Sequence, residues 1–273
     1  MVKGGSEIFE RENQKGFSPS ALQELGQCPL KYFFDKGLTL GDPDDPLSRQ
    51  ELSADRRGTV YHEILKDFYE DLYRRGLTHE LFDSAALEYL NRAFARHCRA
   101  EDYRLYGIYP VVWELILQDI YEKLSAFVLE DLHQLGSFTP ARFEMPVSAE
   151  ATDELPLRLR GIIDRLDVDE KTKTLRVADY KSSRKGSKNL DVDFFKELIF
   201  QPFVYVWIAQ RLKEWENYHS AGSCLLSINK GYVRRELSAD AFEQMRPRAC
   251  DFLKMLTGFI QNGTFFISPS DLC

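Results

Sequence analysis

Apolar residues recur at spacings of three and four along the first half of the chain, which is the period of an amphipathic helix. The clearest stripe begins after Asp55 and consists of Val60, Ile64, Leu65, Phe68 and Leu72. Further helices are predicted at residues 18–26, 80–99 and 110–135, the first with Ser18 as its N-cap and Pro19 in its first turn. The first 135 residues are therefore expected to be mainly helical.

The period changes to two near residue 141, which predicts β-strands. Strands are expected at residues 141–147, 157–168, 174–181, 223–228 and 232–237. Residues 191–212 are apolar on nearly all sides and predict a buried helix, in which Pro202 either introduces a kink or begins a second helix. Residues 239–260 predict a closing amphipathic helix. Helices thus precede and follow a β-β-β-α-β order.

The strands at 157–168 and 174–181 flank a charged turn and read as a β-hairpin. The second strand ends in Asp179-Tyr180-Lys181, so the carboxylate and the amine share one face while Tyr180 points to the other. Asp164 adds a carboxylate on the paired strand, where Gly161 would permit a bulge or a close backbone approach. This arrangement predicts a divalent metal beside a lysine that activates water.

Composition limits the alternatives. A chain of 273 residues with 44% hydrophobic and 13% aromatic residues is expected to fold rather than remain disordered. The net charge of −7 and the pI near 5.4 exclude a uniformly basic nucleic-acid-binding surface. A local basic strip, Arg184, Lys185 and Lys188, follows the hairpin and could contact a phosphate backbone, although an ordinary solvated loop reads the same way.

The longest apolar run, residues 203–209, is far shorter than the roughly 18 residues that suggest a membrane span. Residues 1–17 are polar, lack the apolar segment of a secretory signal and are expected to form a flexible leader. A cytoplasmic location is therefore expected.

One histidine and two of the cysteines stand apart from the hydrophobic pattern. His62 lies near the start of the helix that follows Asp55, where a ligand could approach, although a lone histidine is more often structural. Cys28 precedes a proline in a turn-like segment and Cys273 is the last residue. The others, Cys98, Cys224 and Cys250, are expected to be small core residues.

Taken in order, these motifs resemble the PD-(D/E)XK nuclease superfamily. Within it, the chain is similar to the RecB-like and AddB-type exonuclease domains of helicase-nucleases and to the CRISPR-associated exonucleases. The motifs that carry the resemblance lie at residues 18–22, 28–34, 58–62, 161–165, 179–181, 201–205 and 263–269. The resemblance implies an α/β (α+β) fold with a restriction-endonuclease-like core, in which helices flank a central mixed sheet. It also implies a helical region at 18–138 that packs on the core and supplies His62, and a nuclease core at 139–273 that is cut short at its end.

The resemblance assigns metal ligands to His62, Asp164, Asp179 and the main-chain carbonyl of Tyr180. Lys181 would orient or activate the attacking water and stabilise charge on the scissile phosphate. The expected ion is Mg²⁺ or Mn²⁺, as suits a site dominated by oxygen ligands.

Three further positions match the family pattern around this centre. Gln201 and Tyr205 match a Q-x-x-x-Y motif that supports the catalytic site and the DNA strand. Glu144 matches an acidic position on the first strand.

Many members of the family also hold a [4Fe-4S] cluster with four cysteines. Cys28 and Cys273 match the first two of these, but no residues remain to supply the others. Either the chain is a fragment that ends short of the cluster, which we favour, or the protein lacks it.

The implied activity is metal-dependent DNA exonuclease action with a helicase domain or partner subunit in DNA repair and recombination. The alternative is a DNA-binding or scaffold module of a helicase-nuclease that no longer cuts. In a third interpretation, the charges of the hairpin form only a solvated face.

Overall fold

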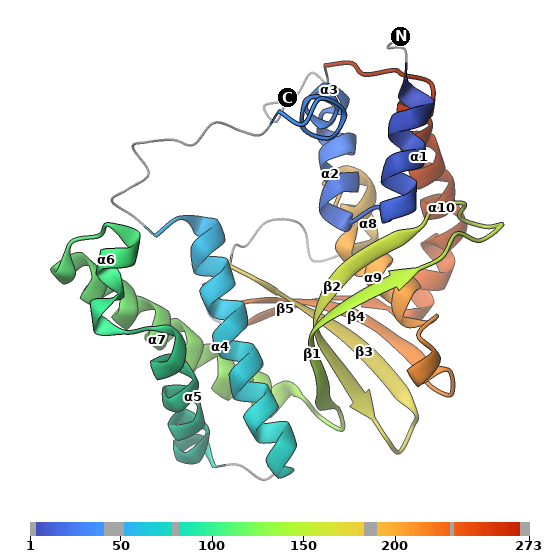
Figure 1. The fold of residues 1–273 in the computed structure, drawn as a ribbon. Coiled ribbons are helices and arrows are strands. Elements are labelled where there is room, and N and C mark those ends of the chain that lie inside the picture. Colours follow the sequence, from blue (N-terminus) through green and yellow to red (C-terminus); the bar gives the residue numbers. More distant parts are fainter. Residues whose placement is uncertain (1–3, 41–51, 78–81, 183–189, 230–231, 268–273) are drawn as a thin grey trace.

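A five-stranded mixed sheet forms the centre of the computed structural model, which describes residues 4–40, 52–77, 82–182, 190–229 and 232–267 (Figure 1). The strands lie in the order β1-β2-β3-β4-β5, and only β3 and β4 run parallel. Their bounds are β1 Thr139–Ala149, β2 Leu159–Asp169, β3 Thr174–Lys181, β4 His219–Ser227 and β5 Val233–Ser238. The mixed sheet predicted from the sequence is confirmed.

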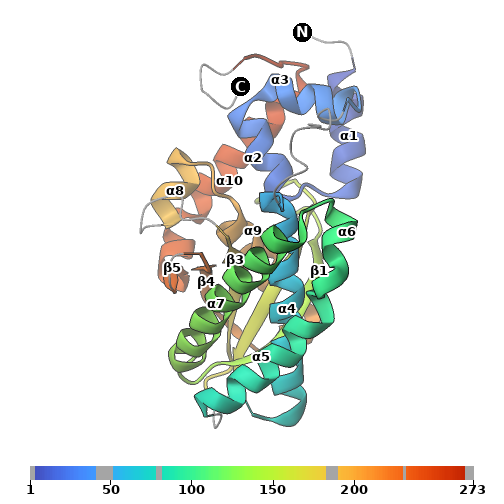
Figure 2. The ribbon, with the colours of Figure 1, turned by 90° about the vertical axis from the view of Figure 1, so that its left-hand side faces the viewer.

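Helices cover both faces of this sheet, as the two views of the ribbon show (Figures 1 and 2). One face carries α4 (Ala54–Arg75), α5 (Asp83–His97), the short α6 (Tyr103–Tyr106) and α7 (Pro110–Gln134). The other carries α8 (Leu190–Lys196), α9 (Gln201–Ala209) and α10 (Ala239–Gln261). Beside α10 lie α1 (Gly5–Lys15), α2 (Pro19–Gln27) and α3 (Pro29–Tyr32). Short helical turns occupy Phe33–Gly37, Ala100–Asp102 and Lys213–Trp215.

Local signals in the sequence fix where these helices begin and end. The hydroxyl of Ser18 accepts a hydrogen bond from the backbone N–H of Ala21 and caps α2 as predicted. Ser53 and Ser238 cap α4 and α10 in the same way, through the third residue along. Gly76 ends α4 with a φ of 66°, a conformation that glycine adopts without steric cost.

The sheet separates two hydrophobic clusters. The first contains the apolar residues of α8 to α10 together with Leu175, Val177 and Leu225 of the strands. The second contains those of α4, α5 and α7 together with Ala178 and Tyr180. Because successive residues of β3 enter different clusters, the predicted alternation of this strand is confirmed.

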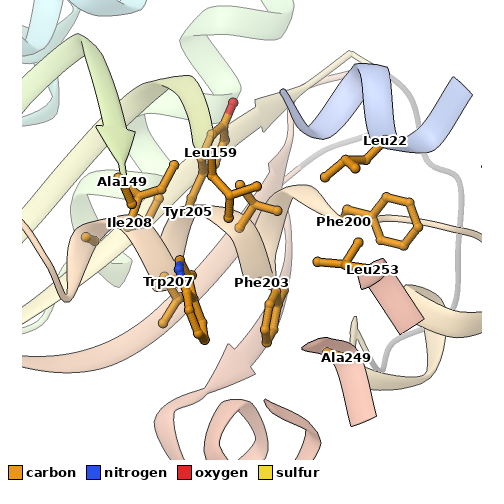
Figure 3. Packing of buried hydrophobic residues seen from close by; sticks show 14 of the residues in the cluster. Leu22, Ala149, Leu159, Phe200, Phe203, Tyr205, Trp207, Ile208, Ala249 and Leu253 are labelled. Carbon is orange, nitrogen blue, oxygen red and sulfur yellow. The ribbon is translucent and has the colours of Figure 1, made fainter. Parts of the chain in front are cut away.

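The helix α9 is the most deeply buried helix of the first cluster. All of its residues after Gln201 are buried, including Phe203 and Trp207. Figure 3 shows Phe200 beside Leu253 of α10, with Phe203 in the same group of buried side chains. This packing holds α9 in place. It therefore also fixes the positions of Gln201 and Tyr205, the two polar side chains of this helix.

One stretch differs from the prediction made from the sequence, and another decides between two alternatives that the sequence left open. The leader predicted to be flexible contains α1, which forms because Phe9 is buried and Ile8 packs beside it on the first cluster. The apolar stretch 191–212 is two helices rather than one, and Pro202 lies in the first turn of the second, where its missing N–H costs nothing.

A fully buried group of charges joins the helical layer to the sheet. Arg165 of β2 lies 2.6 Å from an oxygen of Asp131 on α7 and 2.8 Å from an oxygen of Asp167. Its guanidinium also donates to the hydroxyl of Tyr180 at 3.3 Å. A buried arginine needs such partners because an unpaired charge in the core is very costly.

Among the described residues, no helix is both long and apolar enough to cross a bilayer. The cysteines Cys98, Cys224 and Cys250 are buried as predicted, and burial raises the pKa of the Cys224 thiol to about 12.

Candidate active site

The helix α4 directs His62 toward the acidic residues of the sheet. The Nδ1 atom lies 3.1 Å from Oε1 of Glu144 on β1 and 3.5 Å from Oδ1 of Asp164 on β2. Burial lowers the pKa of His62, but the hydrogen bond with Glu144 and the charges of Asp164, Glu144 and Asp179 outweigh it and raise the pKa to about 9. The surroundings of His62 are therefore strongly negative.

The backbone of Glu144 has a φ of 43°, in a region that residues other than glycine rarely adopt. Its neighbours Phe143 and Met145 pair with Arg165 and Ile163 of β2. A conformation of this kind costs on the order of 1–3 kcal/mol and is often found at functional sites. The strained residue here is the one whose carboxylate contacts His62.

Asp164 is buried, with 6% of its surface exposed. Its Oδ2 accepts a hydrogen bond from the backbone N–H of Tyr180 at 2.7 Å. Burial and the negative charge of Asp179 raise the pKa of Asp164 well above its usual value. A cation placed beside these carboxylates would offset that repulsion.

Lys181 and Asp179 lie together at the end of β3, as the alternation of the strand predicts. Lys181 Nζ lies 2.7 Å from Oδ2 of Asp179 and also donates a hydrogen bond to the side-chain carbonyl of Gln201. The side chain of Gln201 is hydrogen-bonded in turn to Tyr205, which confirms that the two share a face of α9. The lysine is thus held between a carboxylate of the sheet and an amide of the buried helix.

Burial and the charge of Asp179 raise the pKa of Tyr205, so the phenol stays protonated. The ring lies against Gly161, where a Cβ atom would come within 2.4 Å of Cε1 of the tyrosine. The close backbone approach predicted at Gly161 is confirmed, and the residue that approaches is Tyr205.

One imidazole nitrogen and two carboxylate oxygens, from His62, Glu144 and Asp164, lie within 4.8 Å of one another. This donor set fits a divalent cation such as Mg²⁺ or Mn²⁺, because most of the ligand atoms are oxygens. A cation would also stabilise the negative charge of Asp164, which burial and Asp179 disfavour. Asp179 is not one of these three residues, and its Oδ2 contacts Lys181.

A cleft of about 610 Å³ opens beside these residues. It is lined by Glu144 in the middle of β1, by Tyr180 and Lys181 at the end of β3, and by one side of α4. The α4 wall includes Gly58 and Lys66, to which the sequence analysis gave no role. The sequence could have indicated that they lie near His62, because each is four residues from it and residues four apart share a helix face.

Of the remaining candidates, only Cys28 is described, and it lies away from this cluster. Cys28 is buried at the junction of α2 and α3, where its sulfur accepts a hydrogen bond from the backbone of Lys31. Cys273 and the basic strip Arg184, Lys185 and Lys188 lie outside the described residues. The iron-sulfur ligands and the DNA-binding strip stay predictions.

Comparison with known proteins places the chain in a family. Residues 16–273 match a family model described as the PD-(D/E)XK nuclease superfamily. A protein of Moorella thermoacetica, named as a subunit of an ATP-dependent helicase/deoxyribonuclease, is 29% identical over 67% of this chain. The subunit of the same name from Oceanobacillus iheyensis is 24% identical over 93% of it. The aligned regions are 18% and 24% of those two proteins, so the chain spans at most about a quarter of their length.

One solved structure, named "Putative exonuclease" and from Eubacterium rectale, aligns with 100% of this chain and 91% of its own. The TM-score is 0.49 and the identity 10%, which is too distant to support a functional argument.

Proposed function

Since this chain belongs to the PD-(D/E)XK nuclease superfamily, we propose that it is a Mg²⁺- or Mn²⁺-dependent deoxyribonuclease that hydrolyses phosphodiester bonds from a DNA end. The observation that carries the proposal is the juxtaposition of the His62, Glu144 and Asp164 donors with Lys181, which lies at the end of β3 and lines the same cleft as His62 and Glu144. We further propose that it acts with a helicase, as the names of the bacterial relatives suggest, and that this work belongs to DNA repair and recombination in the cytoplasm.

Each side chain has a role that follows from its surroundings. His62, Glu144 and Asp164 would hold the ion, with Asp179 and the carbonyl of Tyr180 beside them. A bound divalent ion lowers the pKa of a coordinated water and offsets charge on the phosphate. These residues therefore supply the negative site that the ion requires.

Lys181 would act on the phosphate itself. Its ammonium is fixed by Asp179 and Gln201, so it presents a positive charge at a defined point, where negative charge grows as the phosphodiester is attacked. Tyr205 acts one step further away, since its hydrogen bond restrains Gln201.

The test is an assay on end-labelled linear DNA with Mg²⁺, with Mn²⁺ and with EDTA. The wild-type protein should degrade DNA only with the metal, and Lys181→Ala and Asp179→Ala should each lose on the order of 10²-fold or more in rate. Lys173→Ala is the matched control, because this lysine lies on the exposed turn of the same hairpin and pairs with Glu170. Thermal unfolding should show that every variant remains folded.

Two results would contradict the proposal. Full activity in either site variant would remove Lys181 or Asp179 from the mechanism. Binding to DNA ends without cleavage by the wild-type protein, in any of the metals, would identify a binding or scaffold module. A covalently closed circular substrate, cut or left intact, separates endonuclease from exonuclease action.

A further inference from the structure

Two glycines of the described helices have no packing reason to be glycine. At Gly5, Gly26 and Gly37 an added Cβ would come within 3 Å of a neighbouring atom, at 2.4, 2.9 and 2.6 Å. At Gly58 of α4 and Gly258 of α10, apart from the two chain neighbours and the helix's own backbone, no heavy atom of the described residues lies within 4 Å of that position. Glycine weakens a helix interior relative to alanine, so an unneeded glycine there calls for another explanation.

Gly58 differs from Gly258 in what it faces. It lines the cleft beside the metal-binding group, four residues before His62 and therefore on the same side of α4. The open space next to its Cα is thus the space in which the substrate of the proposed nuclease would lie. Glycine is the usual residue where another backbone comes close to a helix.

The half-buried Lys66 lies on the same side of α4 as Gly58 and His62. Lys66 lies four residues beyond His62 and also lines the cleft. No ion pair of Lys66 is formed with the residues that the structure describes, whereas Lys123 and Lys173 are paired with carboxylates. A partly buried amine that faces a cleft is suited to a phosphate group from outside the chain.

Acidic groups also face this cleft. Glu63 and Asp55 line the α4 wall, and Glu63 lies 3.5 Å from a ring nitrogen of His97. The row Gly58, His62 and Lys66 is therefore a narrow track rather than a broad basic surface. It suits a single backbone with regularly spaced phosphates.

We infer that one DNA strand runs along α4, with its sugar-phosphate backbone against Gly58 and one phosphate held by Lys66. The inference rests on the proposed nuclease function and extends it to how the strand is placed. Gly58 is a positioning residue, since it makes room and touches no reacting atom. A Cβ at this point displaces the strand from the metal-binding group, and a misplacement of about 1 Å can cost roughly 100-fold in rate.

The experiment compares Gly58→Ala with Gly258→Ala. Both should raise Tm by about 1–4 °C, because alanine favours the helix and meets no described atom. Only Gly58→Ala should slow cleavage of single-stranded DNA, by about 10- to 100-fold in kcat/KM, and Gly58→Leu should slow it further. A more stable protein with a slower reaction is an outcome that a purely structural role of Gly58 does not produce.

Lys66 is tested by the salt dependence of binding. A fluorescent single-stranded oligonucleotide is titrated in the Lys181→Ala background, so that the probe stays intact. Lys66→Gln should weaken binding and reduce the slope of log K against log salt by roughly 0.7. Lys213→Gln is the control, since this exposed lysine follows the far end of α9.

The outcomes distinguish the inferred path of the DNA strand from the proposed nuclease activity. If the wild-type protein cleaves DNA and Gly58→Ala cleaves equally well, or loses stability, the inferred track is wrong while the nuclease stands. An unchanged salt slope for Lys66→Gln likewise removes the phosphate contact. If the wild-type protein does not cleave DNA at all, the proposed function fails first.

Discussion

Replacing Asp164 with asparagine should have opposite effects with and without metal. The amide keeps an oxygen that can accept the hydrogen bond from the backbone of Tyr180, so the hairpin stays intact. It removes one of the negative charges that a divalent ion requires. It also removes a buried carboxylate whose pKa is raised by burial and by Asp179.

The size of the stabilisation by metal follows from the linkage between ion binding and folding. An ion that binds only the folded protein adds about 2.7 kcal/mol to the free energy of unfolding at 100 times its Kd. For a chain of this size, each kcal/mol shifts Tm by roughly 2–4 °C, so saturating Mn²⁺ should raise the Tm of the wild-type protein by about 5–10 °C. The Asp164→Asn variant should gain little or nothing.

In EDTA, the effect of Asp164→Asn on stability should have the opposite sign. Because the pKa of Asp164 in the folded protein lies above its ordinary value of 3.8, its charge opposes folding increasingly as the pH rises above that value. At neutral pH without metal, the variant should therefore be at least as stable as the wild-type protein. Well below pH 3.8 this advantage should disappear, because the carboxyl is then protonated in both the folded and the unfolded state.

The assay is thermal unfolding at neutral pH in EDTA and in a series of Mn²⁺ concentrations. Asp251→Asn on the exposed face of α10 is the matched control and should follow the wild-type protein in both conditions. Equal metal-induced shifts in wild-type and Asp164→Asn protein would refute the role of Asp164 as a ligand. A variant that is much less stable in EDTA would refute the reasoning about its buried charge.

Three further predictions concern the scaffold and are measured by urea unfolding. Gly161→Ala should destabilise the fold by about 1–3 kcal/mol, because its Cβ would overlap the ring of Tyr205, and an unchanged midpoint would contradict that contact. Asp131→Asn should cost about 3–5 kcal/mol, because the buried Arg165 and Arg176 would then share the single carboxylate of Asp167, and a loss below about 1 kcal/mol would show that the pair of Arg165 with Asp131 is not critical. Asp169→Ala should be destabilising at pH 7 and lose its effect as the pH falls from 3.8 toward 2. Ser137 and the turn backbone lower the pKa of this carboxyl to about 2, so its stabilising charge is present above 3.8 and lost through 2, and a pH-independent difference would exclude that role.

The strands and long helices could be predicted because their signals are local. Period two at 174–181 and period three to four after Asp55 each need only a few neighbouring residues to be recognised. The helix α1 could not be predicted in this way, since only Ile8 and Phe9 mark its buried side and the partner surface is α10, at the other end of the chain. Tertiary packing, rather than propensity, makes that segment helical.

The contacts between side chains of the candidate site likewise divide into those that local sequence patterns predict and those that depend on tertiary packing. The contact between Asp179 and Lys181 follows from strand geometry, and that between Gln201 and Tyr205 from the helical repeat. The contact between His62 and Glu144 joins residues 82 positions apart and depends on how α4 packs against β1. No local pattern contains that information, and only the family resemblance suggested that His62 belongs with the acids.

The position of the site between two hydrophobic clusters explains why its parts are so dispersed in sequence. Tyr180 inserts its ring into the cluster of α4 and α7, while its own backbone N–H holds Asp164 and the following residue, Lys181, reaches α9. Arg165 ties the hydroxyl of that tyrosine to α7 through Asp131. The second cluster therefore includes residues from both sides of position 138, where the sequence analysis placed a boundary. Since the helical layer fixes one side of β3 and α9 the other, the distance between the candidate metal ligands and Lys181 depends on both layers being packed at once.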